Sequence, residues 1–230
     1  MRKYRRFGIL VIMSIVLILQ VADSRAEEAS CKADEYKVMS LLIQEQYDKE
    51  FELILINSDT ESWCLREQLS FLQRQWPKLK METIDSLIVN NSGLTIQLAE
   101  RFSIPVEYRL VSDHEYLRAL YDGADNSGGK TLKAGSELAP TGADGYAAIS
   151  DAPEPDWDNF DRVYPDAQGY LTFSRVGFDS DCTQALVIFS NAYRCSGARV
   201  RPGTRKIACF RKKDGAWELV GVSRGINAAD

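Results

Sequence analysis

Apolar and polar positions alternate with a period of two toward the end of the chain. Tyr170–Val176 shows this alternation, which is typical of a half-buried strand. Gln184–Tyr193 is more continuously apolar, as in a central strand that is covered on both faces. Lys206–Lys213 and Ala216–Ser223 then flank a tight turn. The pattern predicts a C-terminal four-stranded antiparallel β-meander.

The last two of these strands are joined by Asp214-Gly215, a strong short signal for a β-hairpin. Cross-strand pairs in a hairpin stabilise it by roughly 0.2–1 kcal/mol each. With these two residues as the turn, the expected facing pairs are Arg211 with Glu218, Phe210 with Leu219, and Ile207 with Val222.

The first half of the chain has mainly the periodicity of amphipathic helices. Two short runs are rich in strand-forming residues, at Phe51–Ile56 and Val106–Val111. The predicted helices are Asp34–Tyr47, Glu61–Trp76, Lys80–Val89, Leu94–Phe102, and a short one through Tyr121 that is capped by Ser112 or Asp113. Trp157–Tyr164 supplies aromatic anchors just before the meander. Helices with a few strands, followed by antiparallel strands, indicate an α+β fold.

The N-terminus has the features of a secretory signal peptide. Basic residues precede an apolar run at Ile9–Leu19, and Ser24-Arg25-Ala26 places small residues at the positions that a signal peptidase reads. We expect residues 1–26 to be the signal peptide and the protein to be exported, periplasmic or secreted. The run is shorter than the about 20 apolar residues of a spanning helix. An uncleaved N-terminal anchor is the alternative.

Residues 27–230 are expected to form a single α+β domain with no membrane span after signal cleavage. Residues 122–148 are rich in glycine and poor in apolar residues. This composition predicts a flexible insert within the domain.

Charge is distributed unevenly along the chain. Residues 27–169 carry 13 basic and 27 acidic side chains, whereas residues 170–230 carry 10 basic and 5 acidic ones. The two parts could attract each other within one fold, which we favour, or the basic part could bind an acidic partner. Nucleic acid is not an expected partner of an acidic exported chain without a stacking platform.

Five cysteines follow the expected cleavage site, and an oxidising compartment permits disulfides. Cys195 and Cys209 flank one loop between neighbouring strands, so their bridge is the first expectation. Cys31 with Cys64 is the second, which leaves Cys182 unpaired. Neither pairing can be derived from sequence alone.

The meander carries residues that resemble a group of uncharacterised exported bacterial proteins. The resemblance lies in Ser174-Arg175-Val176-Gly177-Phe178, the apolar strand from Thr183 to Val187, and the hairpin Lys213-Asp214-Gly215-Ala216-Trp217. It extends to the Ser40-Leu41-Leu42-Ile43 helix and covers about half of the chain after the signal peptide. The loop after Tyr193 departs from the group, because it is basic where related chains are rich in glycine. The resemblance implies an exported α+β domain and no particular activity.

Catalytic and metal-binding signatures are scarce. His114 is the only histidine, no nucleophile-elbow Gly-x-Ser-x-Gly accompanies it, and no Cys-x-x-Cys pair exists for zinc. No glycine fingerprint for a nucleotide is present. Glu154, Asp156, Asp158 and Asp161 are close in sequence, but their spacing matches no calcium loop. We expect no metal, no cofactor and no catalytic residue.

Two groups of residues remain as candidates for specific roles. Arg175, Gly177, Phe178 and Asp179 form the predicted structural turn, with Phe178 folded over the sheet edge and Arg175 held by Asp179 or Asp181. A basic loop is the candidate binding site, with an anion or a partner as its ligand: Arg194, Arg199, Arg201, Arg205 and Lys206.

The sequence therefore leaves two functions open. The favoured one is an exported non-enzymatic module that binds a protein or an anionic envelope component through the basic loop. The alternative is an exported hydrolase that uses carboxylates or an atypical His114 site.

Overall fold

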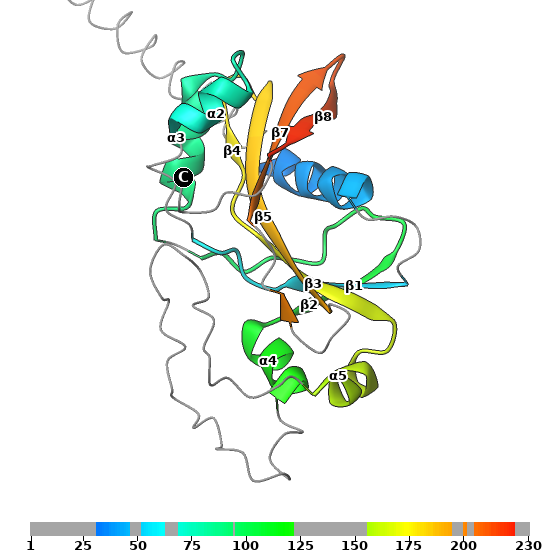
Figure 1. The fold of residues 1–230 in the computed structure, drawn as a ribbon. Coiled ribbons are helices and arrows are strands. Elements are labelled where there is room, and N and C mark those ends of the chain that lie inside the picture. Colours follow the sequence, from blue (N-terminus) through cyan, green and yellow to red (C-terminus); the bar gives the residue numbers. More distant parts are fainter. Residues whose placement is uncertain are drawn as a thin grey trace, which may run out of the picture.

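The protein folds as an α+β structure around one large mixed sheet (Figure 1). The computed structural model describes residues 31–46, 52–62, 69–93, 95–121, 156–194, 200–201 and 205–223. The first helix covers residues 31–46. The other helices are α2 (Leu69–Gln75), α3 (Met81–Asn90), α4 (Asp113–Tyr121) and α5 (Trp157–Val163). The strands are β1 (Leu53–Asn57), β2 (Glu107–Val111), β3 (Ala167–Phe173), β4 (Gly177–Phe178), β5 (Gln184–Arg194), β6 (Val200–Arg201), β7 (Lys206–Lys213) and β8 (Ala216–Val222).

The eight-stranded sheet has the order β2-β1-β3-β5-β7-β8, and the short strands β4 and β6 both pair with β5. β1 is parallel to β2 and β3, whereas β3, β5, β7 and β8 pair antiparallel in succession. The α+β class predicted from the sequence is confirmed. The predicted meander is correct only in part, because its four strands belong to a larger sheet that continues through the parallel strands.

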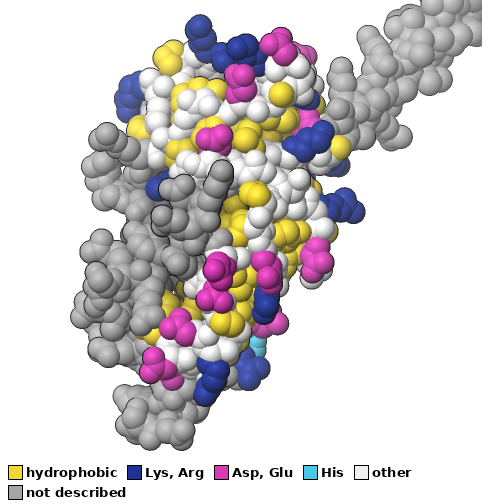
Figure 2. All heavy atoms as spheres, turned by 90° about the vertical axis from the view of Figure 1, so that its right-hand side faces the viewer, with side chains coloured by type: hydrophobic (Ala, Val, Ile, Leu, Met, Phe, Trp, Pro, Cys, Tyr) yellow, Lys and Arg dark blue, Asp and Glu magenta, His cyan; other side chains and the backbone are white. Residues whose placement is uncertain are grey.

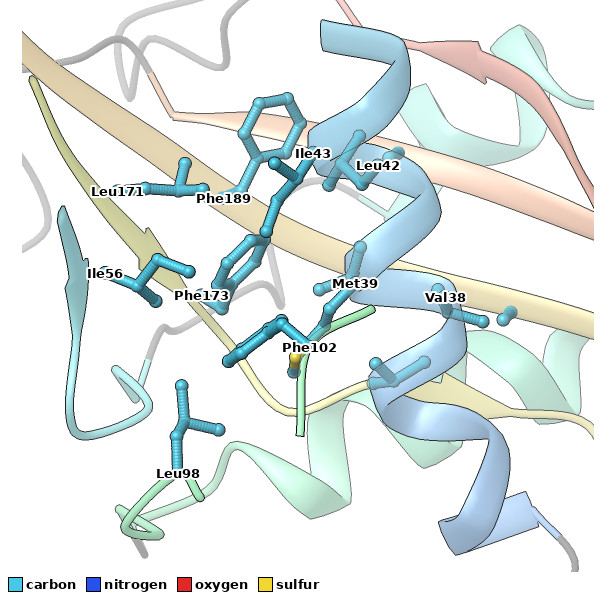
Figure 3. Packing of buried hydrophobic residues seen from close by; sticks show 14 of the residues in the cluster. Val38, Met39, Leu42, Ile43, Ile56, Leu98, Phe102, Leu171, Phe173 and Phe189 are labelled. Carbon is cyan, nitrogen blue, oxygen red and sulfur yellow. The ribbon is translucent and has the colours of Figure 1, made fainter. Parts of the chain in front are cut away.

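One face of the sheet is covered by the first helix and by the segment that follows α3 (Figure 3). Met39, Leu42 and Ile43 of this helix point toward Phe173 and Phe189 of the sheet. Each of the three helix residues is at most 1% exposed. Full burial of such a side chain contributes about 1.5–3 kcal/mol to the stability of the fold. The helix supplies several of these side chains to the largest core cluster.

The opposite face of the sheet is covered by two pairs of helices. α2 and α3 pack over β5 and β7, where Leu186, Ile188 and Ile207 are buried. α4 and α5 pack over β1 and β3, around Tyr116 and Tyr170, whose rings stack at 4.1 Å. In Figure 1 the first helix and the α2–α3 pair accordingly lie on opposite sides of β5. β5 is thus buried on both faces, as its apolar sequence predicts.

Several local predictions are confirmed and others are corrected. The α4 start has a capping box, in which Glu115 N–H donates to Ser112 Oγ at 3.2 Å and Ser112 N–H donates to Glu115 at 2.9 Å. The predicted helix at Leu94–Phe102 is wrong, since its described residues are irregular apart from a bridge at Gln97. Of the predicted helix Glu61–Trp76, only Leu69–Gln75 is helical. Its predicted start is wrong, because Glu61 and Ser62 are not helical, and residues 63–68 lie outside the described residues.

The hairpin of β7 and β8 has the predicted turn and two of the three predicted pairs. Arg211 faces Glu218, and Phe210 faces Leu219. The third pair is wrong, because a bulge between Cys209 and Phe210 shifts the register. The predicted signal peptide and the predicted insert lie outside the described residues.

The surface that includes the outer side of the first helix mixes charge with apolar area (Figure 2). A strip of apolar side chains runs down this face, and side chains of both charges surround it. A solvated surface of this kind is ordinary for a globular domain and does not by itself indicate a binding site.

Candidate functional site

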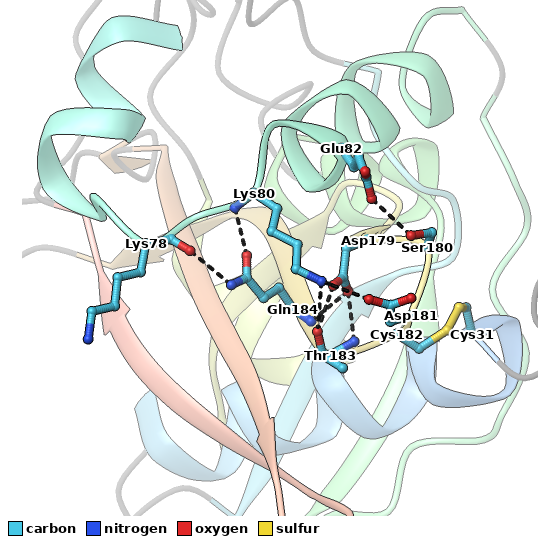
Figure 4. Close-up of polar contacts among 10 residues, drawn as sticks. All are labelled: Cys31, Lys78, Lys80, Glu82, Asp179, Ser180, Asp181, Cys182, Thr183 and Gln184. Carbon is cyan, nitrogen blue, oxygen red and sulfur yellow. Dashed lines mark hydrogen bonds and ion pairs between the residues drawn. A yellow bond between two sulfur atoms is a disulfide. The ribbon is translucent and has the colours of Figure 1, made fainter.

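The turn that follows β4 is built around the buried carboxylate of Asp179 (Figure 4). This residue is 1% exposed, and the backbone N–H groups of Thr183 and Gln184 each donate to it at 2.7 Å. The Thr183 hydroxyl and the Lys80 ammonium also donate to it, each at 2.6 Å. Burial would raise the pKa of this carboxyl, but the hydrogen bonds from Lys80, Thr183 and Gln184 hold the pKa below its ordinary value. Asp179 is therefore charged at neutral pH.

Lys80 is the residue before α3, and its side chain reaches the carboxylates of this turn. Its ammonium lies 2.6 Å from Asp179 and 3.0 Å from Asp181. The hydrogen bonds to Asp179 and Asp181 raise the pKa of Lys80 above its ordinary value. A protonated lysine has no lone pair, so it can act neither as a base nor as a nucleophile. The pair is arranged for structure and charge neutralisation.

Gln184 fastens the connection between α2 and α3 onto the start of β5. Its side-chain amide donates to the Lys78 carbonyl at 3.0 Å and accepts from the Lys80 N–H at 2.8 Å (Figure 4). Ser180 adds a further contact by donating to Glu82 at 2.9 Å. The two Gln184 bonds satisfy a backbone N–H and a backbone carbonyl of this connection.

The segment before β4 is held by the C-terminal end of α3. The Asn91 side chain accepts from Arg175 N–H at 2.9 Å and donates to the Arg175 carbonyl at 3.1 Å. Asn90 donates to the Val176 carbonyl at 2.9 Å. The last residue of α3 and its C-cap Asn91 thus take the hydrogen-bonding role of a neighbouring strand for this segment.

The predicted structural turn is assembled differently from the expectation. Arg175 lies 3.7 Å from Glu35 of the first helix rather than against Asp179 or Asp181, because Lys80 occupies those carboxylates. The half-buried Phe178 packs against Trp217 of β8, with ring centroids 5.7 Å apart. Gly177 packs directly against the backbone of α3. All three residues therefore have structural contacts.

The disulfide joins Cys31 to Cys182, with their Cα atoms 5.6 Å apart. Both predicted pairings are therefore wrong: Cys31 is not bonded to Cys64, and Cys209 is a free buried thiol. Cys209 lies on the face of β7 that packs against α2 and α3. Folding instead brings the turn of Cys182, which has a positive φ of 51°, onto the start of the first helix. Cys64 and Cys195 lie outside the described residues.

Asp34, one turn after Cys31, ties the first helix to the last hairpin. Its carboxylate accepts from Lys212 at 2.6 Å and from the Trp217 indole at 3.0 Å. Burial raises the pKa of Asp34, but the hydrogen bonds from Lys212, Lys37 and Trp217 outweigh burial and lower it. Together with the pair of Glu35 and Arg175, this contact joins the acidic part of the chain to the basic part, as expected from the charge distribution.

The candidate binding loop is described only at its base. β5 and β6 pair antiparallel, with Arg194 opposite Val200 and Tyr193 opposite Arg201. Arg199 and the side chains of Arg194 and Arg201 lie outside the described part of the chain. Arg205 and Lys206, at the start of β7, are half-buried. The structure therefore shows a hairpin base at this position, while the binding role stays a prediction.

The residues of the alternative hydrolase are placed as follows. His114 lies exposed on the first turn of α4, and it is the cyan side chain in Figure 2. Asp156 caps α5 by accepting from Asn159 N–H at 2.9 Å. Asp158 and Asp161 are exposed, and Glu154 lies outside the described residues. Of the described carboxylates, Asp156 caps α5, and Asp158 and Asp161 lie on its exposed side.

Sequence reasoning missed a hydrogen-bonded polar group at the carboxyl ends of the parallel strands β1 and β2, in which the exposed Asp113 contacts two buried residues. Asp113 accepts from Tyr170 at 2.7 Å and from Asn57 at 3.2 Å. Asn57 is 2% exposed and Tyr170 is 4% exposed. The signal that could have located the group was a parallel pairing of the two predicted strands, because it brings residues at their ends together.

Comparisons with known protein families, curated proteins and solved structures find no match. The resemblance to exported bacterial proteins therefore stays an expectation. Within the described ranges, no group of three or more His, Cys, Asp or Glu residues is placed to hold a metal ion. Of the helices that are described, none is long and apolar enough to cross a membrane.

Proposed function

We propose that the protein is an exported, disulfide-stabilised binding domain that recognises an anionic partner through the basic hairpin at residues 194–206. The observation that carries this proposal is the positive charge of the hairpin together with its attachment to two central strands of the sheet. Residues 194–206 contain five basic and no acidic side chains, in a chain with a net charge of −5. Arg194 ends β5 and Lys206 begins β7, and both strands are central strands of the sheet.

Attachment to well-ordered strands favours binding, because a binding segment that is already ordered loses less conformational entropy on association. β5 pairs with β3 along Gly169–Phe173 and with β7 along Lys206–Arg211. Its residues Ala185–Phe189 are at most 3% exposed. The base of the hairpin therefore belongs to a strand that is paired on both sides and buried at its centre. The positive charges of the hairpin would steer an acidic partner toward it.

Export is supported by the N-terminal signal sequence and by the bond between Cys31 and Cys182. Disulfides persist mainly in oxidising compartments, such as the periplasm or the extracellular space. Cell fractionation with N-terminal sequencing tests this part of the proposal. We expect the protein outside the cytoplasm, with a new N-terminus after Ala26.

Charge reversal in the hairpin tests the binding proposal. The variant carries Arg199→Glu and Arg201→Glu, and the probe is cross-linking and co-purification from an envelope extract at low and high salt. Because surface electrostatics are screened by salt, the wild-type association should weaken as salt rises. We expect the variant to lose its partners at every salt concentration.

A matched control reverses two exposed basic residues on the other hairpin, Arg211→Glu and Lys213→Glu. It changes the net charge by the same amount and should retain the partners. Equal losses in both variants would indicate non-specific charge attraction. Unchanged association of the hairpin variant would refute the proposed site.

A further inference from the structure

The first helix is attached to the sheet in an asymmetric way. Val38, Met39, Leu42 and Ile43 are each at most 1% exposed against the sheet. The disulfide, hydrogen bonds and ion pairs that link the helix to β7, β8 and the segments around β4 lie in its first turn, at Cys31, Asp34 and Glu35.

Beyond the first turn, the side-chain hydrogen bonds of the helix reach a different segment. Tyr36 accepts from Ala99 N–H at 2.8 Å, and Ser40 accepts from Ser103 N–H at 2.9 Å. Gln44 donates to the Ser103 carbonyl at 2.6 Å. These bonds go to the irregular chain before β2 and not to the strands.

The covalent restraints on the helix come from two directions. At its end, the chain continues from residue 46 to β1, which begins at Leu53. At its start, the bond of Cys31 to Cys182 links the helix to the turn after β4, across 151 residues of sequence. When this bond is broken, the start of the helix loses its covalent link to that turn, and opening the helix gains the entropy that the closed loop withheld.

We propose that the Cys31–Cys182 disulfide is a redox latch for the helix at residues 31–46. With the bond formed, the helix is docked and the core is closed. With the bond reduced, the helix opens more often as a local unit, while the sheet of β3, β5, β7 and β8 persists. The core is therefore held closed most firmly in an oxidising compartment.

The chemistry of the latch needs a dithiol reductant. A reductant thiolate attacks one sulfur of the bond and forms a mixed disulfide, and its second thiolate then closes the oxidised reductant ring. Two electrons and two protons pass to Cys31 and Cys182, which become thiols. Cys209 does not enter this exchange, because it is buried in the core cluster under α2 and α3, and burial raises the pKa of its thiol to about 12.

Amide hydrogen exchange on the oxidised and the dithiothreitol-treated protein tests the latch. We expect the amides of residues 35–43 to exchange roughly a hundredfold faster after reduction, within the range of one disulfide crosslink. The amides of β5 and β7 should keep their protection. The double variant Cys31→Ser, Cys182→Ser should show the same local pattern without reductant. If this variant does not fold, the reduction experiment decides alone.

Asp34→Asn is the matched control, because it removes the first-turn ion pair and keeps the disulfide. Its helix amides should lose less protection than those of the reduced protein. Three results would overturn the latch: unchanged protection after reduction, equal loss of protection across the whole sheet, or a bond that dithiothreitol cannot reduce without global unfolding. An Asp34→Asn effect as large as that of reduction would assign the restraint to the ion pair instead.

Discussion

The contact between Gly177 and α3 allows a sharp test of the packing. A Cβ at position 177 would lie 2.5 Å from the Cα of Leu87 and 2.6 Å from its Cβ, and it would also overlap the Leu87 nitrogen. Carbon atoms in contact are normally about 3.5–4.0 Å apart, so α3 would have to move by about 1 Å. Leu87 is fully buried, which leaves little room for this movement.

The same movement would disturb the hydrogen bonds that hold this junction together. Ser86 accepts from Phe178 N–H at 3.2 Å, and Asn90 and Asn91 hold the preceding residues. Overpacking of a core costs about 1–3 kcal/mol, and each weakened hydrogen bond about 0.5–1.5 kcal/mol. We therefore expect Gly177→Ala to lower the free energy of unfolding by about 3 kcal/mol.

Urea unfolding of the oxidised protein, followed by tryptophan fluorescence, measures this loss. Gly221→Ala is the matched control, because its Cβ would meet only Trp76 at an ordinary 3.6 Å. The control should stay within roughly 0.5 kcal/mol of wild type. Adding Leu87→Ala should not rescue Gly177→Ala, since alanine keeps the overlapping nitrogen, Cα and Cβ atoms. A loss for Gly177→Ala no larger than that of the control would refute the reasoning.

Three further predictions concern the buried polar and thiol groups. Asp179→Asn should lower the free energy of unfolding by about 2–3 kcal/mol, because an amide cannot accept all four hydrogen bonds and leaves Lys80 partly unpaired. Urea unfolding measures this loss. A loss smaller than that of the exposed control Asp158→Asn would contradict the prediction. The lowered pKa values of Asp34 and Asp179 stabilise the folded state at neutral pH, and this stabilisation should be lost as pH falls below about 4, the range in which an unfolded aspartate takes up its proton. Melting temperatures from pH 7 to pH 3 should therefore fall less steeply for Asp34→Asn than for wild type, and parallel curves would count against this assignment. Cys209→Ala should leave the number of thiols that react with Ellman's reagent in the folded protein unchanged and lower it by one in the denatured protein, because burial protects this thiol.

Local patterns in the sequence determined most of the secondary structure. The alternation in β3, the apolar run of β5 and the Asp214-Gly215 turn are readable because side-chain direction in a strand and turn preference depend on near neighbours. The capping box at Ser112 and Glu115 is local for the same reason. The strands β3 and β5, the turn and the cap at Ser112 are confirmed in the structure. The half-burial predicted for β3 is wrong, because Tyr170 and Thr172 are buried as well as Leu171 and Phe173.

Register was less predictable where it depends on one extra residue. The bulge at Cys209 and Phe210 moves Val222 from Ile207 to Ala208. A bulge leaves the apolar composition of a strand almost unchanged, so periodicity does not reveal it. The irregular stretch before β2 was missed similarly, because its apolar residues match a helical pattern while its backbone bonds go to Ser58 and Thr60.

The residues of the candidate sites show which properties only tertiary structure decided. The sequence by itself predicted export, an α+β fold, and a structural role for the turn at Arg175–Asp179, and of these the structure confirms the fold class. It could not show that Arg175 meets Glu35, that Lys80 meets Asp179, or that Cys31 meets Cys182, since each pair joins elements far apart in the chain. The parallel pairing of β1 with β2 and β3 was equally hidden, because a strand buried on both faces reads the same in either direction. The packing of the helices on the two faces of the sheet decides which charges and cysteines become partners. This packing depends on residues from all parts of the chain.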